Sequence, residues 1–195
     1  MLRGIRNKAD LLLALLYAGK ALSPDQQFSE PIAGITRLEK LLFLLKKDEG
    51  FLKAVPDPER NDFHFVPFRM GPWTHEVYDE VDFLESLGLM TKESRDKRSA
   101  ADAAHDDELF SEMVLDKYQK TAADVEEEIE VFSLTEKGRK KATEIWSRLT
   151  EEEKRRIINN KKKFNKMDLR QFLRYVYKKY PEYCTESEIK SYLNV

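Results

Sequence analysis

The segment from Phe68 to Thr91, FRMGPWTHEVYDEVDFLESLGLMT, decides the fold of this 195-residue chain. Gly71-Pro72 predicts a turn that follows an extended segment. One helix is predicted after this turn, because Thr74 can cap its start and Gly88 can close its end. With both ends of this helix defined, the elements before and after it can be placed around it.

The predicted helix is acidic on the side that faces away from its apolar stripe. Val77, Val81 and Leu84 recur at helical spacing and predict a buried face. At 100° per residue, Asp79 and Asp82 project to the opposite side. A helix in this place enters the major groove of DNA in winged-helix proteins, yet this one contains no Lys or Arg.

The flanking segments complete a winged-helix plan. Two helices are predicted before the quoted segment, one that Asn7 caps and one on the apolar stripe that begins at Leu38. After it, residues 130–134 should pair with residues 90–92 as a hairpin, and Thr135 should cap another helix. Three helices and a hairpin are typical of a winged helix, so we expect a mainly α fold with a small β wing.

Two further segments lie outside this plan. Residues 92–128 are acidic and poor in large apolar groups, which predicts an insertion at the tip of the wing with one short helix at 109–118. The predicted domains are a winged-helix-like domain at 1–148, which contains this insertion, and a C-terminal helical extension at 149–195 packed on the body. Capping patterns predict the helix starts of the extension; they are Thr150 with Glu153, Asn165 with Asp168, and Thr185 with Glu188.

The net charge of −2 conceals a strong asymmetry along the chain. Residues 1–95 carry 13 basic and 15 acidic side chains, residues 96–130 carry 4 and 12, and residues 131–195 carry 17 and 9. The last segment therefore has a net charge of +8. Contacts with phosphate are expected there, if anywhere.

Cysteine usage and hydropathy indicate the compartment. Cys184 is the sole cysteine, which excludes an intramolecular disulfide and a cage of thiolates around a metal. No signal peptide is recognisable, and the apolar run at 11–18 is too short for a bilayer, which needs about 20 residues. We expect a cytoplasmic protein that does not contact a membrane.

No pattern indicates catalysis. His64, His75 and His105 are scattered, and His75 with Asp79 has metal-ligand spacing but lacks a third ligand. No glycine-rich phosphate loop occurs among the seven glycines. We expect no enzyme activity, no metal site and no cofactor.

Binding of a macromolecule is the remaining class of function. DNA-binding proteins neutralise phosphates with Lys and Arg, so the acidic helix is a poor candidate for a groove. Basic clusters after the wing could contact phosphates, or they could be solvated faces balanced by acids. The nucleic-acid candidates are Lys137, Arg139, Lys140, Lys141, Arg155, Arg156, Lys161, Lys162 and Lys163.

The acidic helix and the aromatic corner before it form the alternative, a surface for a protein partner. Aromatic side chains near residues 63–73 and 175–183 either pack together in the interior or form an interface patch. The protein-partner candidates are Arg69, Trp73, Glu76, Asp79 and Asp82.

Four segments resemble known families: ITRLEKLLFLL, FVPFRMGPWTHEVYDEVDFLESLGL, FSLTEKG and YVYKKYPEY. Together they resemble the SocA-like antitoxin (Panacea) domain and the related YwgA-like proteins. The helix and wing also resemble PadR-like and MarR-like regulators. The resemblance implies a winged-helix body without a catalytic centre, with a role in toxin neutralisation, phage defence, proteolytic adaptation or regulation.

Two functions therefore remain open. We expect first a noncatalytic regulatory or adaptor protein that binds a macromolecular partner, in particular a protein. The alternative is a transcriptional regulator that binds DNA as a homodimer through its basic C-terminal half and its wing.

Overall fold

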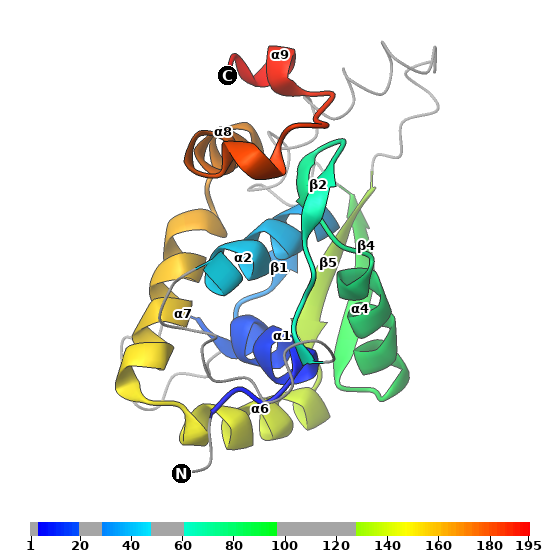
Figure 1. Cartoon of the computed structure of the whole chain (residues 1–195). Coiled ribbons are helices and arrows are strands. Elements are labelled where there is room, and N and C mark those ends of the chain that lie inside the picture. Colours follow the sequence, from blue (N-terminus) through cyan, green and yellow to red (C-terminus); the bar gives the residue numbers. More distant parts are fainter. Residues whose placement is uncertain (1–3, 20–28, 48–60, 97–127) are drawn as a thin grey trace.

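The computed structural model describes residues 4–19, 29–47, 61–96 and 128–195. It combines helices with a three-stranded antiparallel sheet and a separate two-stranded sheet (Figure 1), which confirms the mainly α fold class. The helices are α1 (Lys8–Tyr17), α2 (Ile35–Lys47), α4 (Glu76–Ser86), α6 (Glu136–Arg148), α7 (Glu151–Phe164), α8 (Leu169–Lys179), the 3-10 helix η2 (Pro181–Tyr183) and α9 (Lys190–Leu193). The strands are β1 (Ile32–Ala33), β2 (Val66–Phe68), β3 (Gly71–Trp73), β4 (Met90–Asp96) and β5 (Glu128–Leu134).

The order of helices and strands follows the predicted winged-helix plan. β4 and β5 form the antiparallel hairpin of the wing, in which Met90 pairs with Leu134. β1 pairs with the other edge of β5, where Ile32 lies opposite Phe132. This third strand was not predicted, because two residues are too few to show an alternating pattern.

The hairpin is longer than predicted, so the insertion is shorter than 92–128. β4 continues to Asp96 and β5 begins at Glu128, because the two strands stay in register over seven residue pairs. The predicted insertion therefore shrinks to residues 97–127. That segment, with the short helix predicted at 109–118, lies outside the described residues.

The hydrophobic core surrounds α1, which lies in the middle of the body (Figure 1). Each residue from Leu11 to Leu16 is at most 2% exposed, as expected for a helix that is apolar all round. Ile157, Phe164 and Phe172 of α7 and α8 belong to the same core. The predicted packing of the C-terminal helices on the body is thereby confirmed.

Side chains cap three helices where the sequence predicted them. Asn7, Thr135 and Thr150 accept hydrogen bonds from the backbone N–H three residues later, at 2.8, 2.9 and 3.2 Å. Each bond satisfies a donor that the first turn of a helix leaves without a partner.

Two of the predicted capping boxes are wrong. Asn165 ends α7, and Asp168 instead caps α8 by accepting from the N–H of Gln171 at 2.9 Å. α9 has Ile189 as its N-cap residue, and its apolar side chain has no acceptor for a capping hydrogen bond.

Gly138 allows α6 to pass close to the end of α4. A Cβ at this position would lie 1.7 Å from the carbonyl oxygen of Leu89. Backbone at such a distance leaves room for glycine alone. α6 is thereby held under α1, where Ala142 and Ile145 are buried.

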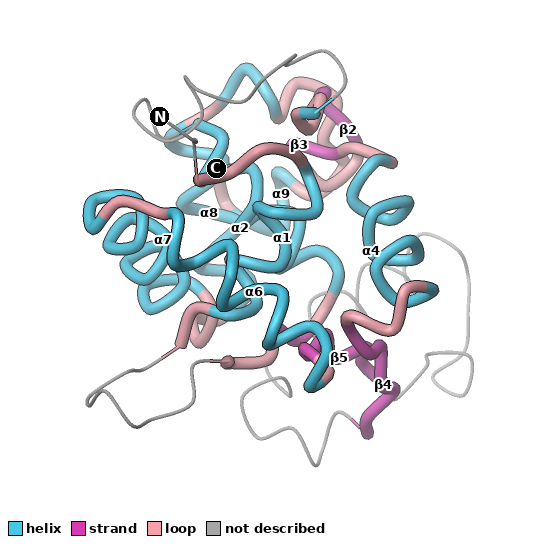
Figure 2. The backbone as a smooth tube through the Cα atoms, turned by 90° about the horizontal axis from the view of Figure 1, so that it is seen from below, coloured by secondary structure: helices cyan, strands magenta, loops and turns pink. Residues whose placement is uncertain are grey.

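α4 and α7 lie on opposite sides of the body. In Figure 1 and in the perpendicular view of Figure 2, α7 is at the left and α4 at the right. The acidic helix α4 and the basic helix α7 therefore present separate surfaces. Among the helices in the described ranges, none has the length and apolarity to span a bilayer.

Candidate partner-binding surface

α4 packs on the body through one face and leaves the other in solvent. Val77, Val81 and Leu84 are at most 2% exposed. The side chains of Asp79 and Asp82 on the outer face are 67% and 71% exposed. The predicted division of this helix into an apolar and an acidic side is confirmed.

Thr74 acts one position earlier than a regular cap. His75 is the N-cap residue of α4, and its side chain makes no capping hydrogen bond. The hydroxyl of Thr74 accepts from the N–H of Glu76 at 3.3 Å. Thr74 therefore still satisfies a donor at the start of the helix.

An aromatic stack connects the β2–β3 hairpin with the start of α4. Ring centroids lie 4.9 Å apart in Phe68–Trp73, 6.2 Å in Trp73–His75 and 6.0 Å in His75–Tyr78. The guanidinium of Arg69 lies 5.7 Å from the Phe68 ring, while His75 contacts Asp79 at 3.2 Å. A continuous run of contacts thus joins three predicted partner residues, which are Arg69, Trp73 and Asp79.

Exposed apolar side chains gather on the same elements. Val66 and Phe68 of β2 are 48% and 39% exposed, and Phe83 of α4 and Leu87 after it are 53% and 42% exposed. Among the described residues, Val195 is the other large apolar side chain with comparable exposure. Sequence reasoning missed Phe83, although its position between acidic residues was the available signal.

Several other aromatic side chains of the two clusters pack against the interior. The ring of Phe43 contacts Phe65, Tyr180 and Tyr183 with centroids 5.0 to 5.2 Å apart. Phe63 is fully buried. The interior interpretation therefore holds for Phe63 and Phe65, whereas Tyr175, Tyr180 and Tyr183 stay partly exposed.

Glu76, one of the predicted partner residues, faces the body and does not belong to the candidate surface. Its carboxylate accepts from Nζ of Lys8 at 2.8 Å and from the N–H of His64 at 2.6 Å. Burial raises the pKa of Glu76, but these hydrogen bonds and the charge of Lys8 outweigh burial and lower the pKa to about 2. The first turn of α4 thus uses its acid to hold α1 and the segment before β2.

Glu76→Gln is expected to destabilise the protein at neutral pH and not at low pH. Because the folded pKa of about 2 lies below the ordinary 4.5, the stabilisation is complete above pH 4.5 and is lost as the pH falls to 2. Since 28% of the side chain is exposed, screening limits the loss to about 1–2 kcal/mol. Urea unfolding at pH 7 and near pH 2 measures it, with Asp79→Asn as the exposed control. Equal losses at both pH values would contradict this role.

The basic candidates on α6 are engaged within the chain. Lys137 donates to the carbonyl oxygen of Leu87, the C-cap residue of α4, at 2.7 Å. Arg139 donates to the carbonyl oxygen of Leu134, the last residue of β5, at 3.0 Å. Lys140 and Lys141 pair with acids of α6 at 2.9 and 3.1 Å. Acids therefore balance two of these four charges, and the other two cap carbonyl groups at the ends of α4 and β5.

The basic run on α7 does not form one face. Neighbouring residues of a helix point 100° apart, so Lys162 and Lys163 are exposed in different directions while Lys161 points inward. Arg155 is exposed, and Arg156 pairs with Glu152 at 2.6 Å.

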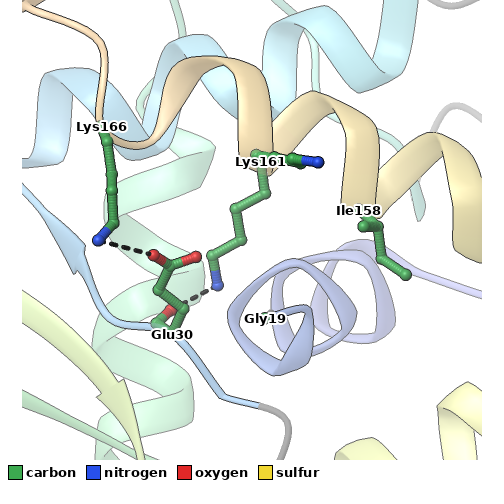
Figure 3. Close-up of a pocket in the computed structure, with 6 residues that line it drawn as sticks. Gly19, Glu30, Ile158, Lys161 and Lys166 are labelled. Carbon is green, nitrogen blue, oxygen red and sulfur yellow. Dashed lines mark hydrogen bonds and ion pairs between the residues drawn. The ribbon is translucent and has the colours of Figure 1, made fainter. Parts of the chain in front are cut away.

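Lys161 is 1% exposed, so its prediction as a nucleic-acid contact is wrong. Its Nζ donates to the carbonyl oxygens of Leu15, Leu16 and Glu30 at 2.8, 3.0 and 2.5 Å, and Figure 3 shows it pointing to Glu30. Burial lowers the pKa of Lys161 to about 7, and the Glu30 carboxylate opposes this shift. The side chain joins α7 to the C-terminal end of α1.

Groups with catalytic or metal-binding chemistry are sparse in this part of the chain. Among the described residues, no group of three or more His, Cys, Asp or Glu side chains could hold a metal. The contacting pair His75 and Asp79 lies in solvent. Cys184 is buried, and burial raises the pKa of its thiol to about 11, so the reactive thiolate is disfavoured.

No family model, curated protein or solved structure matches this chain. The resemblance to the SocA-like and YwgA-like families therefore stays a prediction from its four segments. The surface on α4 and its chemistry carry the functional argument.

Proposed function

We propose that this chain is a noncatalytic regulatory or adaptor protein that binds another protein. The contact surface, named here the α4 surface, consists of Phe68, Arg69, Trp73, Asp79, Asp82 and Phe83. The observation that carries the proposal is Phe83, which is 53% exposed on the helix that a winged-helix protein would place in DNA. Asp79 and Asp82 stand beside it, so this helix presents an apolar anchor within negative charge.

This chemistry favours a protein partner with an apolar pocket rimmed by Lys or Arg. Burying a phenylalanine side chain contributes about 1.5–3 kcal/mol. Aromatic residues and arginine are enriched among the side chains that dominate binding energy at interfaces. Complementary charge at the rim would raise the association rate and orient the partner as it docks.

In the described part of the wing, one lysine faces several acids of α4 and β5 and offsets only part of their charge. Lys92 of β4 lies 3.5 Å from Asp82, 3.8 Å from Glu85 and 3.9 Å from Glu130. Burial lowers the pKa of Lys92, but the three carboxylates outweigh it and raise the pKa. Lys92 is thus committed to holding α4 against the wing, and phosphates would meet net negative charge.

Substitutions that reverse the charge of α4 or replace its exposed phenylalanine test this proposal. Tagged chain is recovered from native cells after cross-linking, and the proteins that accompany it are quantified. We expect Phe83→Arg and the double variant Asp79→Lys, Asp82→Lys each to lower recovery of one specific protein at least tenfold. Glu144→Lys on α6 is the matched control and should retain it.

Two results would contradict the α4 surface. One is full recovery of the partner with both variants while their thermal stability is unchanged. The other is a gel shift that shows binding of duplex DNA by the wild-type chain. If Phe83→Arg abolished this binding and the Asp79→Lys, Asp82→Lys variant did not strengthen it, α4 would be a DNA-reading element.

A further inference from the structure

A basic cleft lies on the α7 side of the molecule, between α2, α7 and α8. Its volume is about 640 Å³, within the range of about 300–1,000 Å³ that is typical of small-molecule sites. Among the described residues, no acidic side chain lines it. The lining residues that carry charge or hydrogen-bonding groups toward a ligand are Lys47, Arg156, Asn160, Lys163, Tyr175 and Lys179.

Two lysines of this cleft have no acidic partner among the described residues, unlike several other lysines. Lys140, Lys141 and Lys154 each pair with a carboxylate on their own helix, at 2.7 to 3.1 Å. For Lys163 and Lys179, the described part of the chain offers no carboxylate within ion-pair distance. Two uncompensated charges that share one concave site favour an anion that would balance both.

Aromatic rings hold these ammonium groups in place. Nζ of Lys163 and Nζ of Lys179 lie 4.5 and 5.6 Å from the centroid of the same ring, Tyr175. Lys47 lies 4.2 Å from the ring of Tyr183 and donates to its hydroxyl at 2.7 Å. Side chains that are ordered in advance lose less entropy when a ligand binds.

The extent of the site indicates the size of the ligand. Arg156, Asn160 and Lys163 follow one stripe of α7 at i, i+4 and i+7, which spans roughly 10 Å. Asn160 also lines the cleft, one turn from Arg156 and Lys163. A site of this length fits a few linked phosphates better than the many-nucleotide track of a single-strand binder.

We propose that the cleft between α2, α7 and α8 binds a small molecule that carries two or more linked phosphate groups. Lys163 and Lys179, which both contact the Tyr175 ring, bind the phosphates, and Lys47 and Arg156 also line the site. This site is independent of the α4 surface, so either proposal can fail while the other stands.

Isothermal titration calorimetry of the full chain with sodium triphosphate and with adenosine triphosphate tests this site. Both probes should bind with a stoichiometry of one at physiological salt. Tighter binding of the nucleotide would assign a nucleotide as the source of the phosphates, and equal binding would assign the phosphate chain alone.

Lys163→Gln and Lys179→Gln should each raise Kd about tenfold, because each removes one charge-assisted contact. The matched control is Lys162→Gln, which removes the same charge from the neighbouring position that does not line the cleft. It should leave Kd unchanged. Melting temperatures of all variants verify that folding is retained, and Lys179→Gln suffices if Lys163→Gln loosens α7.

Three results would overturn the proposal. The first is no saturable heat with either probe in the millimolar range. The second is an equal loss of affinity in Lys162→Gln, since that would show attraction by net charge without a site. The third is binding of a long single-stranded oligonucleotide without binding of triphosphate.

Discussion

Glu39→Ala is expected to destabilise the fold by about 3–5 kcal/mol, because it leaves a buried ammonium without its counterion. Glu39 and Lys40 are 2% and 1% exposed. The carboxylate of Glu39 accepts from Lys40 at 2.6 Å and from the N–H of Thr74 at 3.0 Å. Lys40 also donates to the carbonyl of Pro72 at 2.7 Å. The pair thus fixes the backbone on both sides of Trp73.

Urea unfolding monitored by circular dichroism measures the loss. Glu144→Ala, which breaks an exposed pair on α6, should change stability by less than about 0.5 kcal/mol. The double variant Glu39→Leu, Lys40→Leu should recover part of the loss, because it removes both buried charges. It cannot recover all of it, since the N–H of Thr74 and the carbonyl of Pro72 stay unpaired. A double variant as unstable as Glu39→Ala would contradict the counterion explanation.

The same pair has a consequence for partner binding. Trp73 belongs to the aromatic stack and Thr74 precedes α4, so the buried carboxylate of Glu39 holds the corner of the α4 surface. Partner recovery with Glu39→Ala should therefore fall even at a temperature where the chain is still folded. Unchanged recovery would place the contact on the outer face of α4 alone.

Lys161→Met is expected to destabilise the protein by about 2–3 kcal/mol at pH 7, because three buried carbonyl oxygens lose their donor. Relief from burying the amine reduces this loss near neutral pH. The folded pKa of about 7 lies below the ordinary 10.5, so between these values the unfolded chain holds a proton that the folded chain has released. Wild-type stability therefore gains up to about 1.4 kcal/mol per pH unit above pH 7 from this residue.

The difference between wild type and Lys161→Met should accordingly widen as pH rises from 7 to 9. Urea unfolding at several pH values measures this difference and cancels the contributions of groups that both proteins share. Lys162→Met, an exposed neighbour, should follow the wild-type profile. Parallel profiles for wild type and Lys161→Met would show that Lys161 stays charged in the folded protein.

Local spacing in the chain predicts much of the fold. The apolar stripe of α4, the all-apolar α1 and the caps at Asn7, Thr135 and Thr150 all depend on residues within one or two helical turns. Such interactions are complete within each segment, so they can be recognised before the segments meet. The two faces of α4, and with them the choice of Asp79 and Asp82 as surface residues, followed from the same periodicity.

Three-dimensional packing assigned the roles of the charged residues. Lys161, Lys162 and Lys163 are consecutive and chemically identical. Lys161 is nevertheless buried, Lys162 is exposed, and Lys163 lines the cleft. Lys161 is buried against carbonyl oxygens of α1. These partners lie 145 and 146 residues away along the chain, so only the folded structure reveals them. The cleft likewise combines α2 with α7 and α8. The energy of a buried charge depends on partners that the folded chain brings within about 3 Å, and spacing along the sequence does not record them.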